Sequence, residues 1–128
     1  MSGYSVNIEQ RTLENDYFRE VLYTAPHLQL VLMTLQPGEE IGQEKHDDGD
    51  QFIRVEAGQG EAILDGERHA LNDGMVVVIP AGAEHNVINT SQSEPLRLYT
   101  IYSPPEHPDG TINRTKQDAI EYERAHHG

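Results

Sequence analysis

Residues 74–89 of this chain read GMVVVIPAGAEHNVIN and follow the pattern G-x5-P-x-G-x2-H-x3-N. The apolar run Met75–Ile79 predicts a strand that is buried on both faces. Pro80 ends that strand, and Gly82 allows a tight turn after it. His85 is then expected near the start of the next strand. A rigid support of this kind suits an imidazole that binds a metal ion.

A second segment, residues 38–58, reads GEEIGQEKHDDGDQFIRVEAG and follows the pattern G-x5-E-x-H-x4-Q-x6-G. With these two segments the chain resembles the cupin superfamily. The first motif of that family is similar to G-x5-H-x-H-x3–4-E-x6-G, and its second is the pattern that ends at Asn89. Two positions depart from the family. Glu44 stands where the first histidine is usual, and Gln51 stands where glutamate is usual.

The resemblance implies an all-β fold, a double-stranded β-helix or jelly-roll barrel, with a divalent metal inside it. It also implies a small-molecule ligand, often a sugar, phenol or organic acid, and a homodimer. The metal ligands that it implies are Glu44, His46, Gln51 and His85. Together they supply one carboxylate, two imidazoles and one amide oxygen, which suit a single divalent transition metal ion such as Mn, Fe, Ni or Zn.

The chemistry of these four positions agrees with the resemblance. Glu44 and His46 are two residues apart, so on a strand they point to the same face. The usual His-His-Glu-His set carries one negative charge, and so does Glu-His-Gln-His, so we expect metal binding to survive both departures. Two alternatives stay open. Glu44 could form a salt bridge with Lys45 or Arg54, and the Gln51 amide could hydrogen-bond a ligand or the backbone.

The rest of the chain alternates short apolar runs with turn signals, which is typical of an all-β sandwich or barrel. Asp65-Gly66 predicts a two-residue hairpin turn between 61–64 and 67–69. Three prolines make 104–110 an irregular loop, and Thr115 with Asp118 predicts a capped helix to about Ala125. We expect one domain over 1–128, with the core barrel at about 19–103 and the loop and helix at 104–128. The predicted strands are Val21–Thr24, Leu28–Leu35, Gln51–Val55, Gly60–Leu64, Met75–Ile79, His85–Asn89 and Leu96–Ser103.

Composition limits the possible partners. The formal net charge is −13, from 9 basic and 22 acidic residues. Such a surface repels nucleic acids and anionic membranes. The nearby candidates for binding a strongly anionic substrate are Arg54, Arg68 and Arg97. The chain has no cysteine, and its N-terminus does not resemble a signal peptide. No apolar stretch is long enough to span a membrane, so we expect a cytoplasmic protein.

The sequence therefore predicts a metal-binding small cupin that acts on a small organic molecule, with dioxygenase-like or isomerase-like chemistry. The alternative is a non-catalytic module of the same fold that binds or senses a small molecule. Tyr99 and Tyr102 are three residues apart on the last predicted strand, so one of them should face the cavity. A packing role is favoured for that tyrosine. His107, in the Pro-rich loop, is interpreted as a surface histidine.

Overall fold

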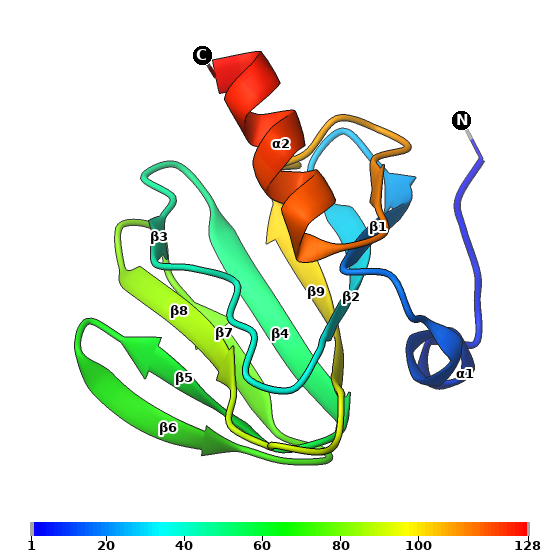
Figure 1. The fold of residues 1–128 in the computed structure, drawn as a ribbon. Helices are drawn as coiled ribbons and strands as arrows, with labels where there is room; N and C mark the ends of the chain where they lie inside the picture. The colour runs from blue at the N-terminus through cyan, green and yellow to red at the C-terminus, as the bar shows by residue number, and fades with distance from the viewer. Residues whose placement is uncertain (1, 128) are drawn as a thin grey trace.

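The computed structural model describes residues 2–127 and consists of two antiparallel sheets with a helix near each end of the chain (Figure 1). The larger sheet has the strand order β10-β1-β2-β9-β4-β7, and the smaller has the order β3-β8-β5-β6. This is the predicted all-β jelly roll with a short C-terminal helix. The elements are α1 Ile8–Glu14, β1 Arg19–Thr24, β2 Gln29–Leu35, β3 Glu44–Lys45, β4 Asp50–Ala57, β5 Gly60–Leu64, β6 Glu67–Leu71, β7 Val76–Ile79, β8 Glu84–Asn89, β9 Leu96–Ser103, β10 Ile112–Asn113 and α2 Lys116–His127.

Most predicted elements are confirmed, with small changes at their ends. β5 and β9 have the predicted bounds, whereas β4 continues to Ala57. At the tip of the β5–β6 hairpin Asp65 has φ 48° and Gly66 has φ 83°, as a two-residue turn with two left-handed residues requires. The Thr115 hydroxyl accepts a hydrogen bond from the Asp118 amide at 3.1 Å, which confirms the predicted helix cap. The sequence did not predict α1 or β10.

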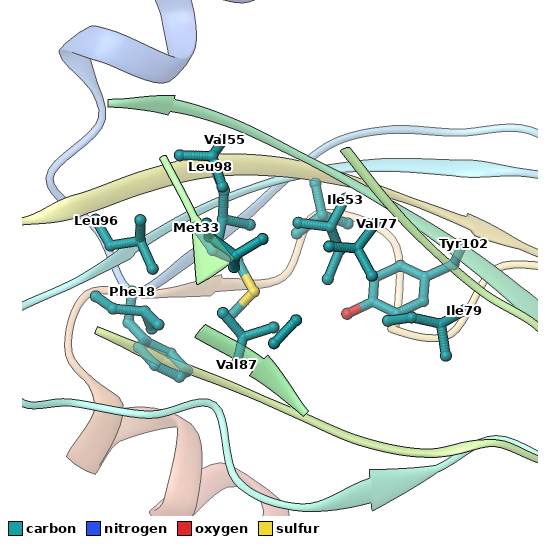
Figure 2. Packing of buried hydrophobic residues seen from close by; sticks show 14 of the residues in the cluster. Phe18, Met33, Ile53, Val55, Val77, Ile79, Val87, Leu96, Leu98 and Tyr102 are labelled. Atoms are coloured by element: carbon teal, nitrogen blue, oxygen red, sulfur yellow. The ribbon is translucent and has the colours of Figure 1, made fainter. Parts of the chain in front are cut away.

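The interior of the barrel changes character along its length. In the larger sheet, cross-strand registration places inward-facing residues of β2, β9 and β4 in rows. The row nearest the Pro-rich loop is polar and contains Gln29, Tyr102 and Gln51. The next row contains Val31, Thr100 and Ile53. The third row is wholly apolar and contains Met33, Leu98 and Val55. These apolar side chains pack with Phe18 and Val87 into one buried cluster (Figure 2).

The prediction that Met75–Ile79 is buried on both faces is wrong. Val77 is only 6% exposed, but Val78 is 63% exposed on the opposite face of β7. One face of β7 packs into the core cluster, while its other face lies on the outer surface of the larger sheet, where Val76 and Val78 are exposed. Phe52 on the neighbouring strand β4 lies on the same side of the sheet as Val78. It pairs with Val78 and is only half-buried, because it lies on that outer face.

The C-terminal helix α2 is anchored through Ala119, which is buried in the same cluster as Phe18. Within residues 2–127, none of the helices combines the length and apolar character that crossing a membrane would demand. In Figure 1, α2 stands at one end of the two sheets and projects away from them.

Candidate metal centre

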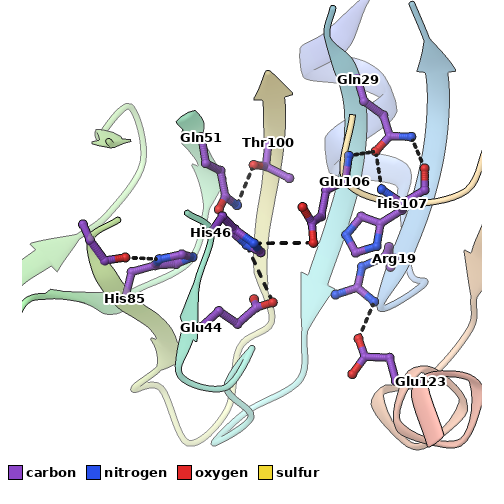
Figure 3. A network of polar contacts seen from close by, with 11 residues as sticks. Arg19, Gln29, Glu44, His46, Gln51, His85, Thr100, Glu106, His107 and Glu123 are labelled. Carbon is purple, nitrogen blue, oxygen red and sulfur yellow. Dashed lines mark hydrogen bonds and ion pairs between the residues drawn. The ribbon is translucent and has the colours of Figure 1, made fainter. Parts of the chain in front are cut away.

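The two sheets together bring the four predicted ligands to the polar end of the barrel (Figure 3). β3 pairs with β8 so that Glu44 lies directly opposite His85, and His46 follows immediately after β3. Gln51 comes from β4 in the other sheet. One ligand atom from each of Glu44, His46 and His85 lies within 4.8 Å of the other two. This spacing allows one ion to contact all three residues.

The side chains of this cluster present unpaired acceptor atoms. His46 Nε2, His85 Nε2 and Gln51 Oε1 are buried and have no hydrogen-bond partner among the described residues. A buried polar atom without a partner is costly and therefore uncommon. Three such atoms in one cluster, beside the Glu44 carboxylate, form a donor set that fits a divalent cation.

Neighbouring groups fix how the two imidazoles are presented. His85 Nδ1 lies 3.1 Å from the Ala83 carbonyl oxygen, and His46 Nδ1 lies 3.4 Å from Glu106 Oε1. An acceptor at Nδ1 favours the tautomer that carries its proton there, which leaves the Nε2 lone pair for a metal. Metal-binding histidines usually have such partners. Glu106 was not among the residues predicted from the sequence.

The amide of Gln51 is oriented by a different contact. Its Nε2 donates to Thr100 Oγ1 at 3.0 Å within the barrel. Because the amide nitrogen is engaged in this way, Oε1 is left as the unpaired acceptor. The bond is to a side chain and not to the backbone, so the backbone alternative for Gln51 is not realised.

Glu44 does not form the salt bridges that were considered for it. Lys45 Nζ lies 3.6 Å from Asp47 Oδ1, and Arg54 Nε lies 2.7 Å from Glu56 Oε1. Burial raises the pKa of Glu44, while the nearby His46, Arg19 and His85 act to lower it. A buried carboxylate whose charged form is disfavoured gains from a cation placed against it.

A cavity of about 480 Å³ adjoins Glu44 and extends beneath the Pro-rich loop. This volume is within the range that is usual for small-molecule sites. The Pro-rich loop and α2 both contribute to its wall. Its lining consists of Arg19, Glu44, Glu106, His107, Pro108, Thr111, Asn113, Tyr122 and Glu123.

The structure corrects the expectation that His107 is a surface residue. Buried Gln29 holds the backbone of the loop, because its Oε1 accepts from the amides of Glu106 and His107 at 3.2 and 3.0 Å. Its Nε2 donates to the His107 carbonyl at 2.7 Å. The His107 ring then lies against Tyr102, with ring centroids 5.2 Å apart. Of the two tyrosines weighed earlier, Tyr102 is the inward one and is buried, whereas Tyr99 lies beside Phe52 on the outer face.

The arginines proposed as anion contacts are not among those that line the cavity. Arg54 pairs with Glu56, Arg68 with Glu61 and Arg97 with Asp16. The cavity instead contains Arg19, which the predicted strand beginning at Val21 left out. Arg19 and Val21 are both buried on β1. Residues two apart on a strand share a face. Extending the predicted strand upstream from Val21 would therefore have placed Arg19 on the same inward face.

Comparisons with known proteins agree with this architecture. The chain is 50% identical over 113 residues to uncharacterized protein L612 of Acanthamoeba polyphaga mimivirus, covering 86% of this chain and 71% of the relative. It is 46% identical over 123 residues to uncharacterized protein YrkC of Bacillus subtilis (strain 168), covering 91% of this chain and 66% of the relative. The chain therefore spans about two thirds of the length of YrkC.

A solved structure matches almost the whole fold. The crystal structure of BH2720 from Bacillus halodurans superposes with a TM-score of 0.90 at 43% sequence identity, covering 94% of this chain and 95% of that one. Residues 31–102 match the family model described as Cupin domain. These residues include both segments that carry the predicted ligands and most of the larger sheet. The chain therefore belongs to the cupin family.

Proposed function

We propose that this protein binds one divalent transition metal ion through Glu44, His46, Gln51 and His85 and acts on a small organic molecule in the adjoining cavity. The observation that carries the proposal is the group of unpaired buried atoms, His46 Nε2, His85 Nε2 and Gln51 Oε1, gathered beside one carboxylate. None of the three atoms has a hydrogen-bond partner among the described residues, and His46 Nε2 lies 3.8 Å from Glu44 Oε2.

Each residue has a distinct part in this site. Glu44 supplies the negative charge, and the two imidazoles and the Gln51 amide supply neutral donors. Glu106 and the Ala83 carbonyl hold the imidazoles in place. Burial raises the pKa of Tyr102, so its phenol stays neutral and provides a polar wall. When bound, the ion supplies either Lewis-acid polarisation of a substrate oxygen or a redox centre for oxygen chemistry.

The test of metal binding is a titration of metal-stripped protein with Mn, Fe, Ni and Zn salts, followed by elemental analysis. We expect one ion per chain. His85→Ala should weaken binding more than Gln51→Ala, because a neutral amide is the poorest donor of the set. His69→Ala is the matched control, since His69 is an exposed histidine that faces Glu67 at 3.6 Å on β6. Acidification should weaken binding because protons compete for the ligands. Equal losses in the His69 and His85 variants would falsify the assignment.

The test of activity compares two reaction classes. Metal-loaded protein is offered phenols, small keto acids and aldose phosphates, while oxygen uptake and isomer ratios are both followed. Oxygen uptake that depends on Glu44 and His85 supports a dioxygenase. Isomerisation without oxygen supports a Lewis-acid mechanism in which a neighbouring base moves the proton. Tight binding without turnover under either condition supports the alternative function, a small-molecule binding or sensing module.

A further inference from the structure

Arg19 is a buried cation that lies over the Phe18 ring, with Cζ 5.3 Å from the ring centroid, and that makes few hydrogen bonds among the described residues. Its side chain lines the cavity next to Glu44, and only 4% of the residue is exposed. Nη1 lies 3.4 Å from Asn113 Oδ1 and 3.8 Å from Glu123 Oε1, and Nε is buried without a partner among the described residues. A guanidinium has five N–H donors in a planar fork. One long hydrogen bond and one loose ion pair leave most of that capacity unused.

His107 lies in the same cavity and also has an unpaired atom. Its Nε2 is buried without a partner among the described residues. Burial lowers the pKa of His107 to about 3, and the nearby charge of Arg19 contributes to this shift. The ring is therefore neutral near pH 7 and can donate or accept one hydrogen bond at Nε2. Gln29 fixes the backbone that carries the ring, so the group is rigidly positioned.

We propose that Arg19 and His107 form an anion-binding subsite that holds the carboxylate of a small organic acid, with the rest of that acid directed toward Glu44 and His46. This proposal rests on the metal-site function above and names its substrate class. The guanidinium fork matches the two oxygens of a carboxylate. The Nε2 atom of His107 provides a further contact within the same cavity.

The charges around the cavity favour a monocarboxylate over a phosphate. Arg19 is the single fixed cation in the described lining, whereas Glu44, Glu106 and Glu123 are carboxylates. In the metal-free protein, a dianion would meet more repulsion from these carboxylates than one guanidinium offsets. One carboxylate needs only one guanidinium, and a cavity of about 480 Å³ accommodates a compact acid that carries a second oxygen function.

Glu123 occupies part of this subsite when no ligand is present. It projects from α2, its side chain is 54% exposed, and its contact with Arg19 is long at 3.8 Å (Figure 3). Exposed ion pairs contribute little to stability, so a ligand carboxylate can displace Glu123 at small cost. Glu123 therefore competes with the substrate for Arg19.

The experiment compares pyruvate with its neutral analogue pyruvamide, using calorimetric and NMR titrations of both metal-free and metal-loaded protein. We expect pyruvate to bind at least about tenfold more tightly than pyruvamide, which is the loss expected when a charge-assisted contact is removed. Arg19→Met should remove this preference, and His107→Phe should reduce it. Metal affinity should be retained in His107→Phe and should not fall in Arg19→Met, since neither residue is a proposed ligand and loss of the Arg19 cation near Glu44 removes a repulsion on the metal ion.

Glu123→Gln is a second variant that keeps the test open if Arg19→Met fails to fold. Removing the competing charge at an exposed position should tighten pyruvate binding a few-fold without changing pyruvamide binding. Arg68→Met is the matched control. It removes one positive charge from a side chain that is 63% exposed and pairs with Glu61 outside the cavity, and it should leave the preference unchanged.

The outcomes separate this proposal from the metal-site function. Equal affinities for pyruvate and pyruvamide, or an undiminished preference in Arg19→Met, overturn the anion subsite even when the metal binds as expected. If no metal binds but metal-free protein still prefers pyruvate in an Arg19-dependent way, the subsite stands and the metal-site function fails.

Discussion

The two halves of the barrel interior are built from the same strands but perform different tasks. Along β4, Gln51 lies at one end and Val55 at the other, and along β9 Leu98 gives way to Tyr102. In the apolar half, the described side chains fill the space with close contacts (Figure 2). In the polar half, several buried nitrogen and oxygen atoms have no partner (Figure 3).

This difference shows which half stabilises the fold and which half holds the atoms that, on the proposed function, would contact ligands. Burial of apolar area is the main favourable contribution to folding, whereas each unpaired buried polar atom costs about 1–3 kcal/mol. The free energy gained in the apolar half therefore offsets the cost of the unpaired atoms in the polar half. One strand can contribute to both halves of the interior. Residues i and i+4 of a strand face the same side but lie at different positions along the barrel.

The largest effect is expected from a cavity in the apolar half. Leu98→Ala should lower the free energy of unfolding by about 3 kcal/mol, because Leu98 is fully buried in the main cluster. Metal affinity measured on the folded protein should change little. Urea unfolding of metal-stripped protein and a metal titration at low temperature check the two statements. A large loss of metal affinity in the folded variant would show that the halves are coupled.

A smaller effect is expected from Glu106, which lies next to the proposed metal-binding residue His46 in the polar half. Glu106→Gln should weaken metal binding by about tenfold, because Glu106 Oε1 faces His46 Nδ1 at 3.4 Å and such partners typically contribute this much. The side chain is 41% exposed, so the stability of the metal-free protein should barely change. Asp48→Asn, which changes the same charge at an exposed site, is the control.

The pH dependence of stability should differ between the halves because His107 is kept neutral. Burial lowers the pKa of His107 from its usual value of 6.5 to about 3, so the unfolded chain binds the proton more readily. The corresponding stability is present above pH 6.5 and is lost as the pH falls toward 3. His107→Phe should remove this loss, which we expect to be about 2–3 kcal/mol by pH 4.5, because each pH unit below 6.5 costs about 1.4 kcal/mol. NMR titration of the His107 ring provides a direct check, and protonation near pH 6.5 would contradict it.

The smallest effect on folding is expected on the outer face of the larger sheet. A row of partly exposed apolar residues crosses four strands there, and we propose that this face forms the expected homodimer. The row consists of Leu30, Ile101, Phe52 and Val78. Val78→Lys should change the stability of the monomer by about 0.5 kcal/mol or less but abolish association in sedimentation equilibrium. Ala70→Lys, on the edge strand β6 of the other sheet, is the control, and a monomeric wild type would exclude the dimer.

Much of the fold could be predicted because its signals are local. The Asp65-Gly66 turn and the two-residue alternation on β9 depend on neighbours in the chain, and both were found. The two segments that carry Glu44 and His85 were also recognised, and the structure brings those side chains together. The error at β7 arose because an apolar run does not reveal whether both faces of its strand are covered by other parts of the protein.

The sequence by itself determined the strands, the turns and the residue types that could bind a metal ion. Only the tertiary structure decided that Arg19 and His107 share a cavity with Glu44. Gln29 lies 78 residues before His107 and fixes it through hydrogen bonds. Contacts between such distant residues depend on how the sheets pair and how the loop folds back. No local pattern of polarity encodes these contacts, because a polar loop residue looks the same in the sequence whether it becomes buried or stays exposed.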